Sequence, residues 1–125
     1  MIEHIENPRA LTALFGDDFD FMNVNLHEVV VHRDGPSLRL RFDIPQVPQS
    51  PPARWPASAN TTQIVLQAGP IEELQITGFT SLCSGILRSL TDKGAPLLEF
   101  TASGCSVKCK FVSLRVESVT GYINA

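Results

Sequence analysis

The residues best suited to chemistry are three histidines and three cysteines, and the histidines do not form a recognisable site. His27 and His32 lie five positions apart, so a regular strand would place them on opposite faces unless a bulge realigned them. His4 lies near the start of the sequence, and no third ligand occurs at metal-binding spacing. We therefore expect no metal site and no cofactor.

The cysteines are Cys83, Cys105 and Cys109, an odd number without CxxC spacing. Cys105 and Cys109 lie four positions apart in a strand-like stretch, which would separate them by about 13 Å on one face. A disulfide needs Cα atoms within about 7 Å of each other. We expect all three cysteines to be reduced and to have structural roles.

No motif for nucleophilic or phosphate chemistry is present. The serines lack a GxSxG-like context, no Cys–His pair is recognisable, and glycine-rich phosphate loops are absent. We therefore expect that the chain is not an enzyme.

The charge is small overall but concentrated near the start. The formal net charge is −3, which argues against nucleic acid as a direct partner. Residues 1–30 contain six acids and one base, and three of the acids, Asp17, Asp18 and Asp20, lie close together. Such asymmetry can steer the approach of a partner, although a solvated acidic surface without a partner explains it equally well.

A proline-rich stretch surrounds the only tryptophan. Residues 45–59 contain five of the nine prolines, which predicts a semi-rigid surface loop between strands. Within it, Arg54 precedes Trp55. The indole ring could be an exposed stacking platform for a sugar or another partner, but a lone tryptophan more often covers one end of a sheet.

The elements that must position these residues begin with one short helix. Asn7 before Pro8 predicts an N-cap followed by proline in the first helical turn. Apolar residues then recur at helical spacing over residues 11–15, and Gly16 is a natural C-cap.

The rest of the chain is typical of β-strands and turns. A change of alternation at His27-Glu28 predicts a β-bulge, and Asp34-Gly35 predicts a hairpin. Residues 37–44 alternate as a strand with one buried and one wet face, which places Asp43 on the wet face. The Gly69-Pro70 pair indicates a turn between two further strands.

We count about eight mostly antiparallel strands and no βαβ spacing. The expected fold is mainly β, a curved sheet or sandwich with the helix on one edge or face, and α+β is the alternative. The length of 125 residues suits one domain over 1–125. No apolar run approaches the roughly 18 residues of a membrane span, and the start does not resemble a signal peptide. We therefore expect a cytoplasmic protein without membrane contact.

Segments across nearly the whole chain resemble, in matching order, the immunity protein 50 family of bacterial polymorphic toxin systems. Each is weakly specific alone, and the ordered set is moderately specific. The segments are residues 5–8 with 14–16, 24–29 with 32–36, 38–43, 51–55 and, more loosely, 74–79 and 108–111.

The resemblance implies an immunity protein that binds and neutralises a cognate toxin domain, but it assigns no toxin-binding residues. From charge, we expect Asp17, Asp18 and Asp20 to contribute to the toxin face, because acidic surfaces suit basic toxins such as nucleases. Arg54 and Trp55 form a second candidate anchor, since both residue types are enriched at interface hot spots.

Two further expectations concern other partners. A small β-rich module that binds carbohydrate or peptide through Trp55 is the alternative function. An exposed strand edge would also allow the chain to form a homodimer.

Overall fold

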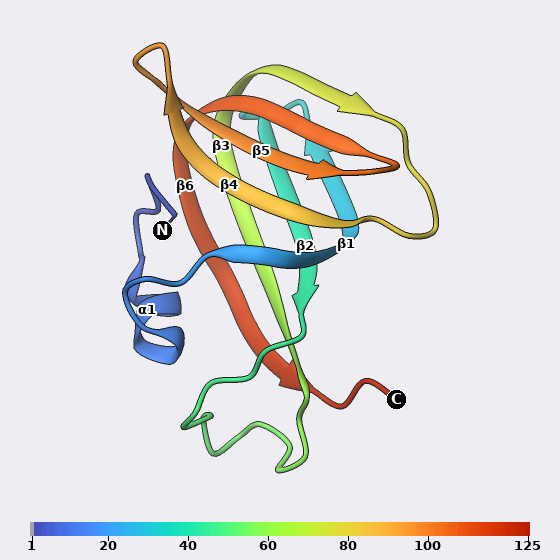
Figure 1. Cartoon of the computed structure of the whole chain (residues 1–125). Coiled ribbons are helices and arrows are strands. Elements are labelled where there is room, and N and C mark those ends of the chain that lie inside the picture. The colour runs from blue at the N-terminus through green and yellow to red at the C-terminus, as the bar shows by residue number, and fades with distance from the viewer. Residues whose placement is uncertain (1) are drawn as a thin grey trace.

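Alternating apolar and polar residues form six antiparallel strands that close into a barrel beside one short helix (Figure 1). The computed structural model describes residues 2–125. Around the barrel the strand order is β1-β2-β3-β6-β5-β4, and β4 pairs with β1 to close the ring. The elements are α1 (Arg9–Phe15), β1 (Phe21–His32), β2 (Ser37–Ile44), β3 (Thr61–Thr77), β4 (Ser84–Asp92), β5 (Ala95–Ala102) and β6 (Ser106–Tyr122).

The mainly β class and the helix are confirmed, but the count of about eight strands is wrong. The Gly69-Pro70 pair does not end a strand: it lies inside β3, where Gly69 still pairs with β6. β6 likewise runs without interruption through Val112, where the alternation of apolar and polar residues changes phase. Two register shifts in the β3–β6 pairing let both 17-residue strands bend and continue. Each of these long strands therefore replaces two expected short ones.

The curved sheet or sandwich is also wrong, because the first and last strands of the sheet pair with each other. Phe21 pairs with Leu87, and Asn25 pairs with Ser84, which joins β1 to β4. Closure satisfies backbone groups that an open sheet would leave at two edges. The homodimer expectation required such an edge, and over the β1–β4 pairing there is none.

Two local features of the first hairpin follow the sequence pattern. The expected β-bulge is confirmed, since the pairing of β1 with β2 shifts register between Leu26 and Glu28. The Asp34-Gly35 turn joins β1 to β2, and His32 pairs with Ser37 across it. The bulge turns His27 toward β2, which becomes important for the polar cluster described below.

The helix ends at Gly16 as expected, but it begins at Arg9 with Pro8, and not Asn7, at the N-cap position. Gly16 ends α1 with a φ of 90°, and its N–H donates to the Thr12 carbonyl. Asn7 does not cap the helix, because its side chain pairs with the backbone of β6. Its amide donates to the Val116 carbonyl at 2.9 Å and its oxygen accepts from the Val116 N–H at 2.8 Å.

Residues 3–7 as a group cover strand edges that the barrel leaves open. The Glu3 N–H donates to the Ser89 carbonyl of β4, and the Glu6 N–H donates to the Leu114 carbonyl of β6. Ile5 forms a parallel bridge with Leu114. The segment thus crosses from β4 to β6, and it fixes the start of α1 against the barrel wall.

The inside of the barrel is filled by apolar side chains from all six strands. Phe42 and Phe100 are fully buried. At the helix end, four phenylalanines form a continuous aromatic ladder, defined as Phe15, Phe19, Phe21 and Phe42, with successive ring centroids 4.6, 5.1 and 5.1 Å apart. In the part of the chain that the structure describes, no helix is long and apolar enough to span a membrane.

The double contact of Asn7 predicts a measurable contribution to stability. We expect Asn7→Ala to lower the free energy of unfolding by about 1–3 kcal/mol, because two backbone groups of β6 lose their partner. Urea denaturation would measure this. The matched control is Asn23→Ala, an exposed β1 position, which should change stability by no more than about 0.5 kcal/mol. Equal effects of the two substitutions would contradict the assigned role of Asn7.

Candidate functional site

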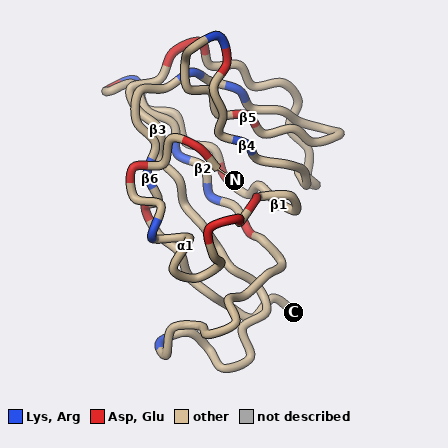
Figure 2. Tube along the Cα trace, turned by 60° about the vertical axis from the view of Figure 1, so that its left-hand side comes forward, with Lys and Arg blue, Asp and Glu red and all other residues tan. Residues whose placement is uncertain are grey.

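The acidic loop, residues 17–20, connects α1 to β1 and is held in place by an aromatic side chain at its centre. Phe19 stacks on Phe15 of the helix and meets Phe21 of β1 edge to face. The aspartates on either side of Phe19 are exposed. Figure 2 shows this acidic run in red between α1 and the start of β1. The structure therefore brings Asp17, Asp18 and Asp20 together on a segment with a fixed apolar anchor.

An apolar groove lies directly beside the acidic loop. It has a volume of about 400 Å³ and runs between the N-terminal segment, α1 and the loop. The residues that line it are Ile2, Ile5, Pro8, Arg9, Leu11, Thr12, Gly16, Asp17 and Phe19. One wall thus comes from the segment that Asn7 and Glu6 tie to β6, and the other comes from the helix.

The groove and the loop together could bind a protein more readily than perform a reaction. The aliphatic side chains offer a place for an apolar anchor, while Asp17 contributes a carboxylate to the rim. Interfaces of this kind combine a desolvated apolar centre with a polar rim. Negative charge at the rim favours a partner whose facing surface is basic. We call the groove and the acidic loop together the acidic groove.

The second pair of candidate residues lies elsewhere. Arg54 and Trp55 belong to the loop between β2 and β3, and neither lines the acidic groove. Arg54 is exposed, but Trp55 is buried, with a relative solvent exposure of only 7%. The indole lies so close to Gly121 of β6 that no side chain would fit there. The tryptophan therefore covers one end of the sheet, and it offers no stacking platform.

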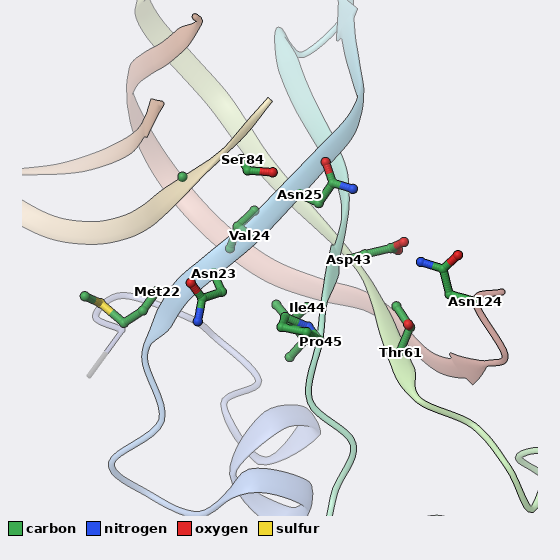
Figure 3. A pocket seen from close by; sticks show the side chains of 11 residues that line it. Met22, Asn23, Val24, Asn25, Asp43, Ile44, Pro45, Thr61, Ser84 and Asn124 are labelled. Carbon is green, nitrogen blue, oxygen red and sulfur yellow. The ribbon is translucent and has the colours of Figure 1, made fainter. Parts of the chain in front are cut away.

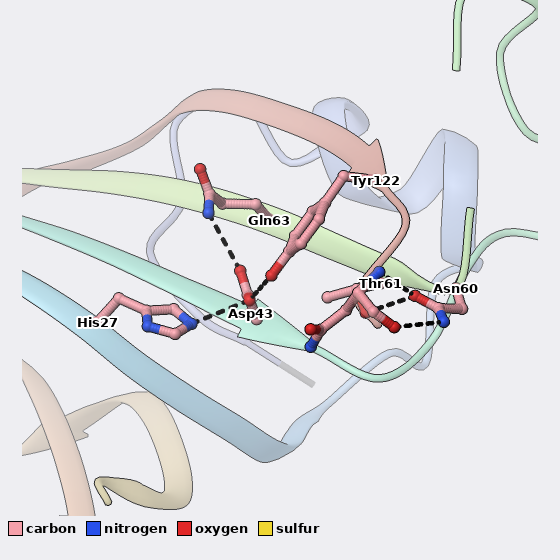
Figure 4. Close-up of polar contacts among 7 residues, drawn as sticks. His27, Asp43, Asn60, Thr61, Gln63 and Tyr122 are labelled. Carbon is pink, nitrogen blue, oxygen red and sulfur yellow. Dashed lines mark hydrogen bonds and ion pairs between the residues drawn. The ribbon is translucent and has the colours of Figure 1, made fainter. Parts of the chain in front are cut away.

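A buried polar cluster, which the sequence did not reveal, lies where β1, β2, β3 and β6 meet (Figure 4). Asp43 is only 4% exposed and accepts from three side chains. His27 Nε2 lies 2.9 Å from one carboxylate oxygen, and Gln63 donates to the other at 3.2 Å. The Tyr122 hydroxyl donates to the same oxygen that His27 contacts. Asp43 raises the pKa of Tyr122 to about 12, mainly because the hydrogen bond favours the protonated phenol.

A cavity of about 410 Å³ opens beside this cluster (Figure 3). Its polar side chains are Asn23, Asn25, Asp43, Thr61, Ser84 and Asn124. These groups could bind a polar molecule, but the lining residues that the structure describes include no aromatic ring for a sugar to stack on. Among residues 2–125, no group of three or more His, Cys, Asp or Glu side chains could hold a metal ion.

Asp43 was expected on a wet strand face, and that expectation is wrong. Strand alternation placed it opposite Phe42 and Ile44, yet all three residues are buried. The reason is that His27, Gln63 and Tyr122 cover the outer face at this point. A change of alternation at His27 was the only signal in the sequence, and it revealed the bulge but not the partner.

Comparison with known protein families gives a match over most of the chain. The family model described as immunity protein 50 matches residues 7–122 of this chain. This range contains α1, all six strands and most of the acidic groove. No curated protein and no solved structure gives a significant match.

The cluster around Asp43 predicts an unusual tyrosine titration. Because Tyr122 is the only tyrosine, tyrosinate absorbance follows this residue alone. We expect a midpoint near pH 12, displaced from the ordinary value of 10.0, and Asp43→Asn should move it back toward 10.0. Since the folded-state pKa is the higher one, the associated stability is complete below pH 10.0 and is lost as the pH rises through about 12. An unchanged midpoint in Asp43→Asn would exclude the carboxylate as the cause.

Proposed function

Because the chain belongs to the immunity protein 50 family, we propose that it is an antitoxin that binds and neutralises a cognate bacterial toxin domain. The match over residues 7–122 is the observation that carries this proposal. Neutralisation by binding requires a stable surface and no reactive group of its own. A closed barrel is suited to this, since a preformed surface loses little conformational entropy on binding.

We place the toxin-binding face at the acidic groove. Two features support this choice: exposed carboxylates on a loop that the aromatic ladder fixes, and an apolar groove beside them. The proposed partner is a toxin domain with a basic surface, as a nuclease has, and with an apolar side chain that enters the groove. The charges would accelerate encounter, and the groove would supply the lasting contact.

Arg54 and Trp55 have less support as a toxin anchor. The indole is buried against β6, so it could contact a partner only after the proline-rich loop moved. Arg54 remains exposed and could contribute to the rim of an interface. The same burial of Trp55 removes the main argument for the alternative function, a carbohydrate- or peptide-binding module built on that ring.

We also propose that the protein acts in the cytoplasm and without catalysis. All three cysteines are unpaired, which suits a reducing compartment. Such a compartment is where an antitoxin would protect the cell against a toxin that attacks intracellular targets. The absence of catalysis follows from the proposed mode of action, since occupying the toxin's surface is sufficient to inhibit it.

The proposed function can be tested by co-expression with the toxin. A toxin domain encoded next to this chain would be expressed in bacterial cells with and without it, and survival would be measured. We expect survival only when both proteins are present, together with co-purification of the two as a complex. Cell death despite normal expression of the folded chain would rule out neutralisation of that toxin.

Charge reversal tests the acidic loop. We expect Asp17→Lys combined with Asp18→Lys to slow association with the toxin about tenfold at low ionic strength, with less effect at high salt. Stopped-flow or surface-based binding kinetics would measure this. The matched control reverses two exposed acids elsewhere, Glu72→Lys with Glu117→Lys. Equal association rates for the two double variants would show that net charge matters and the loop does not.

Filling the groove tests the apolar contact independently of charge. We expect Thr12→Trp to raise the dissociation constant of the complex about tenfold or more, because the new ring would occupy the groove. The adjacent position provides the control: Ala13 is exposed on the same helix and does not line the groove. Ala13→Trp should leave affinity close to that of the unaltered chain. Weak binding by both variants would instead indicate a general effect on α1.

A further inference from the structure

Two of the three cysteines meet at the end of the barrel where β4 and β6 begin. Cys83 directly precedes β4, Cys105 directly precedes β6, and their sulfur atoms lie 2.7 Å apart. Both side chains are buried. Cys109 is also buried but lies further along β6.

Close backbone packing brings the two thiols together. Gly78 adopts a φ of +66°, and a side-chain carbon there would lie 2.5 Å from the Gly104 carbonyl oxygen. Thr80 packs closely against Gly104. The two cysteines are also fixed through their own carbonyls: Leu26 donates to Cys83 at 2.8 Å and Ala102 donates to Cys105 at 3.0 Å. The pair is therefore held by the fold on both sides.

The two thiols are chemically different. The hydrogen bond from Cys105 lowers the pKa of Cys83, so Cys83 forms a thiolate more readily. Burial raises the pKa of Cys105 to about 11, and burial alone does the same to Cys109. A thiolate is the reactive form of cysteine. In the sequence Cys83 directly follows two exposed residues, Ser81 and Leu82.

We propose that Cys83 and Cys105 form a reversible intramolecular disulfide when the protein meets a peroxide. The Cys83 thiolate attacks one peroxide oxygen, the O–O bond breaks, and Cys83 becomes a sulfenic acid as hydroxide takes up a proton to give water. The sulfur of Cys105 then attacks the Cys83 sulfur and loses its proton, while the S–O bond breaks and a second water leaves. Overall two thiols are oxidised by two electrons, and one hydrogen peroxide is reduced to two waters.

The disulfide would fix a loop that exposes apolar side chains. Residues 78–83 connect β3 to β4, and in this loop Phe79 is 51% exposed and Leu82 is 79% exposed. In the reduced protein the loop is held by hydrogen bonds and glycine packing. A covalent link from Cys83 to Cys105 would join it to the β5–β6 turn, and so it would limit the opening of the loop.

Counting thiols tests the chemistry. The full chain would be treated with hydrogen peroxide, denatured, and alkylated, and we expect alkylatable thiols to fall from three to one and to return to three with dithiothreitol. Trypsin cuts after Arg54, Arg88, Lys93 and Lys108, so the disulfide should link peptide 55–88 to peptide 94–108. Hydrogen exchange of residues 78–83 should be slower in the oxidised form.

Variants and alternative outcomes make the test decisive. Cys109→Ser should retain the paired loss, from two thiols to none, whereas Cys83→Ser and Cys105→Ser should abolish the linked peptides. The comparison of oxidised with reduced wild-type protein requires no substitution, so a variant that fails to fold does not affect it. Three remaining thiols, a link through Cys109, a link between two chains, or only sulfinic acid would each overturn the proposal. Unchanged hydrogen exchange would overturn the fixing of the loop.

Discussion

Backbone pairing between β1 and β4 is the constraint on which the rest of the structure depends. It closes the barrel, but it extends only from Phe21 to Asn25 on β1, so parts of the strand edges remain beyond it. Buried backbone groups need partners, and here residues 3–7 supply them by pairing with Ser89 and with Leu114–Val116. The same residues then form a wall of the acidic groove. The proposed binding face is thus a direct product of closing the barrel.

The acidic loop and the Asp43 cluster are held in place by different means. At the helix end, the aromatic ladder ties the acidic loop to the core through Phe19, and the aspartates on either side of Phe19 are exposed. Where β1, β2, β3 and β6 meet, the buried carboxylate of Asp43 accepts hydrogen bonds from side chains of three other strands. An exposed charge is available for recognition, whereas a fully bonded one mainly specifies the fold. This difference supports the acidic groove as the binding face.

How much of the structure the sequence could predict depended on how many positions along the chain separate the interacting residues. The helix with its end at Gly16, the bulge after Leu26 and the Asp34-Gly35 hairpin all follow from residues a few positions apart, and all three are confirmed. Asp43 has partners 16, 20 and 79 positions away, and Cys83 meets Cys105 across 22 positions. No local pattern encodes such pairs. The turn predicted at Gly69-Pro70 was wrong for the same reason, since pairing with the distant strand β6 lets β3 continue through these residues.

The sequence by itself determined that the chain is mainly β with one short N-terminal helix, that acidity gathers near its start, and which family it resembles. These properties depend on residue types and on local periodicity. The tertiary structure decided that the sheet closes, that Trp55 is buried, that a groove forms beside Asp17, and that two cysteines meet. Each of these results depends on contacts between distant segments, and such contacts exist only once the strands have paired.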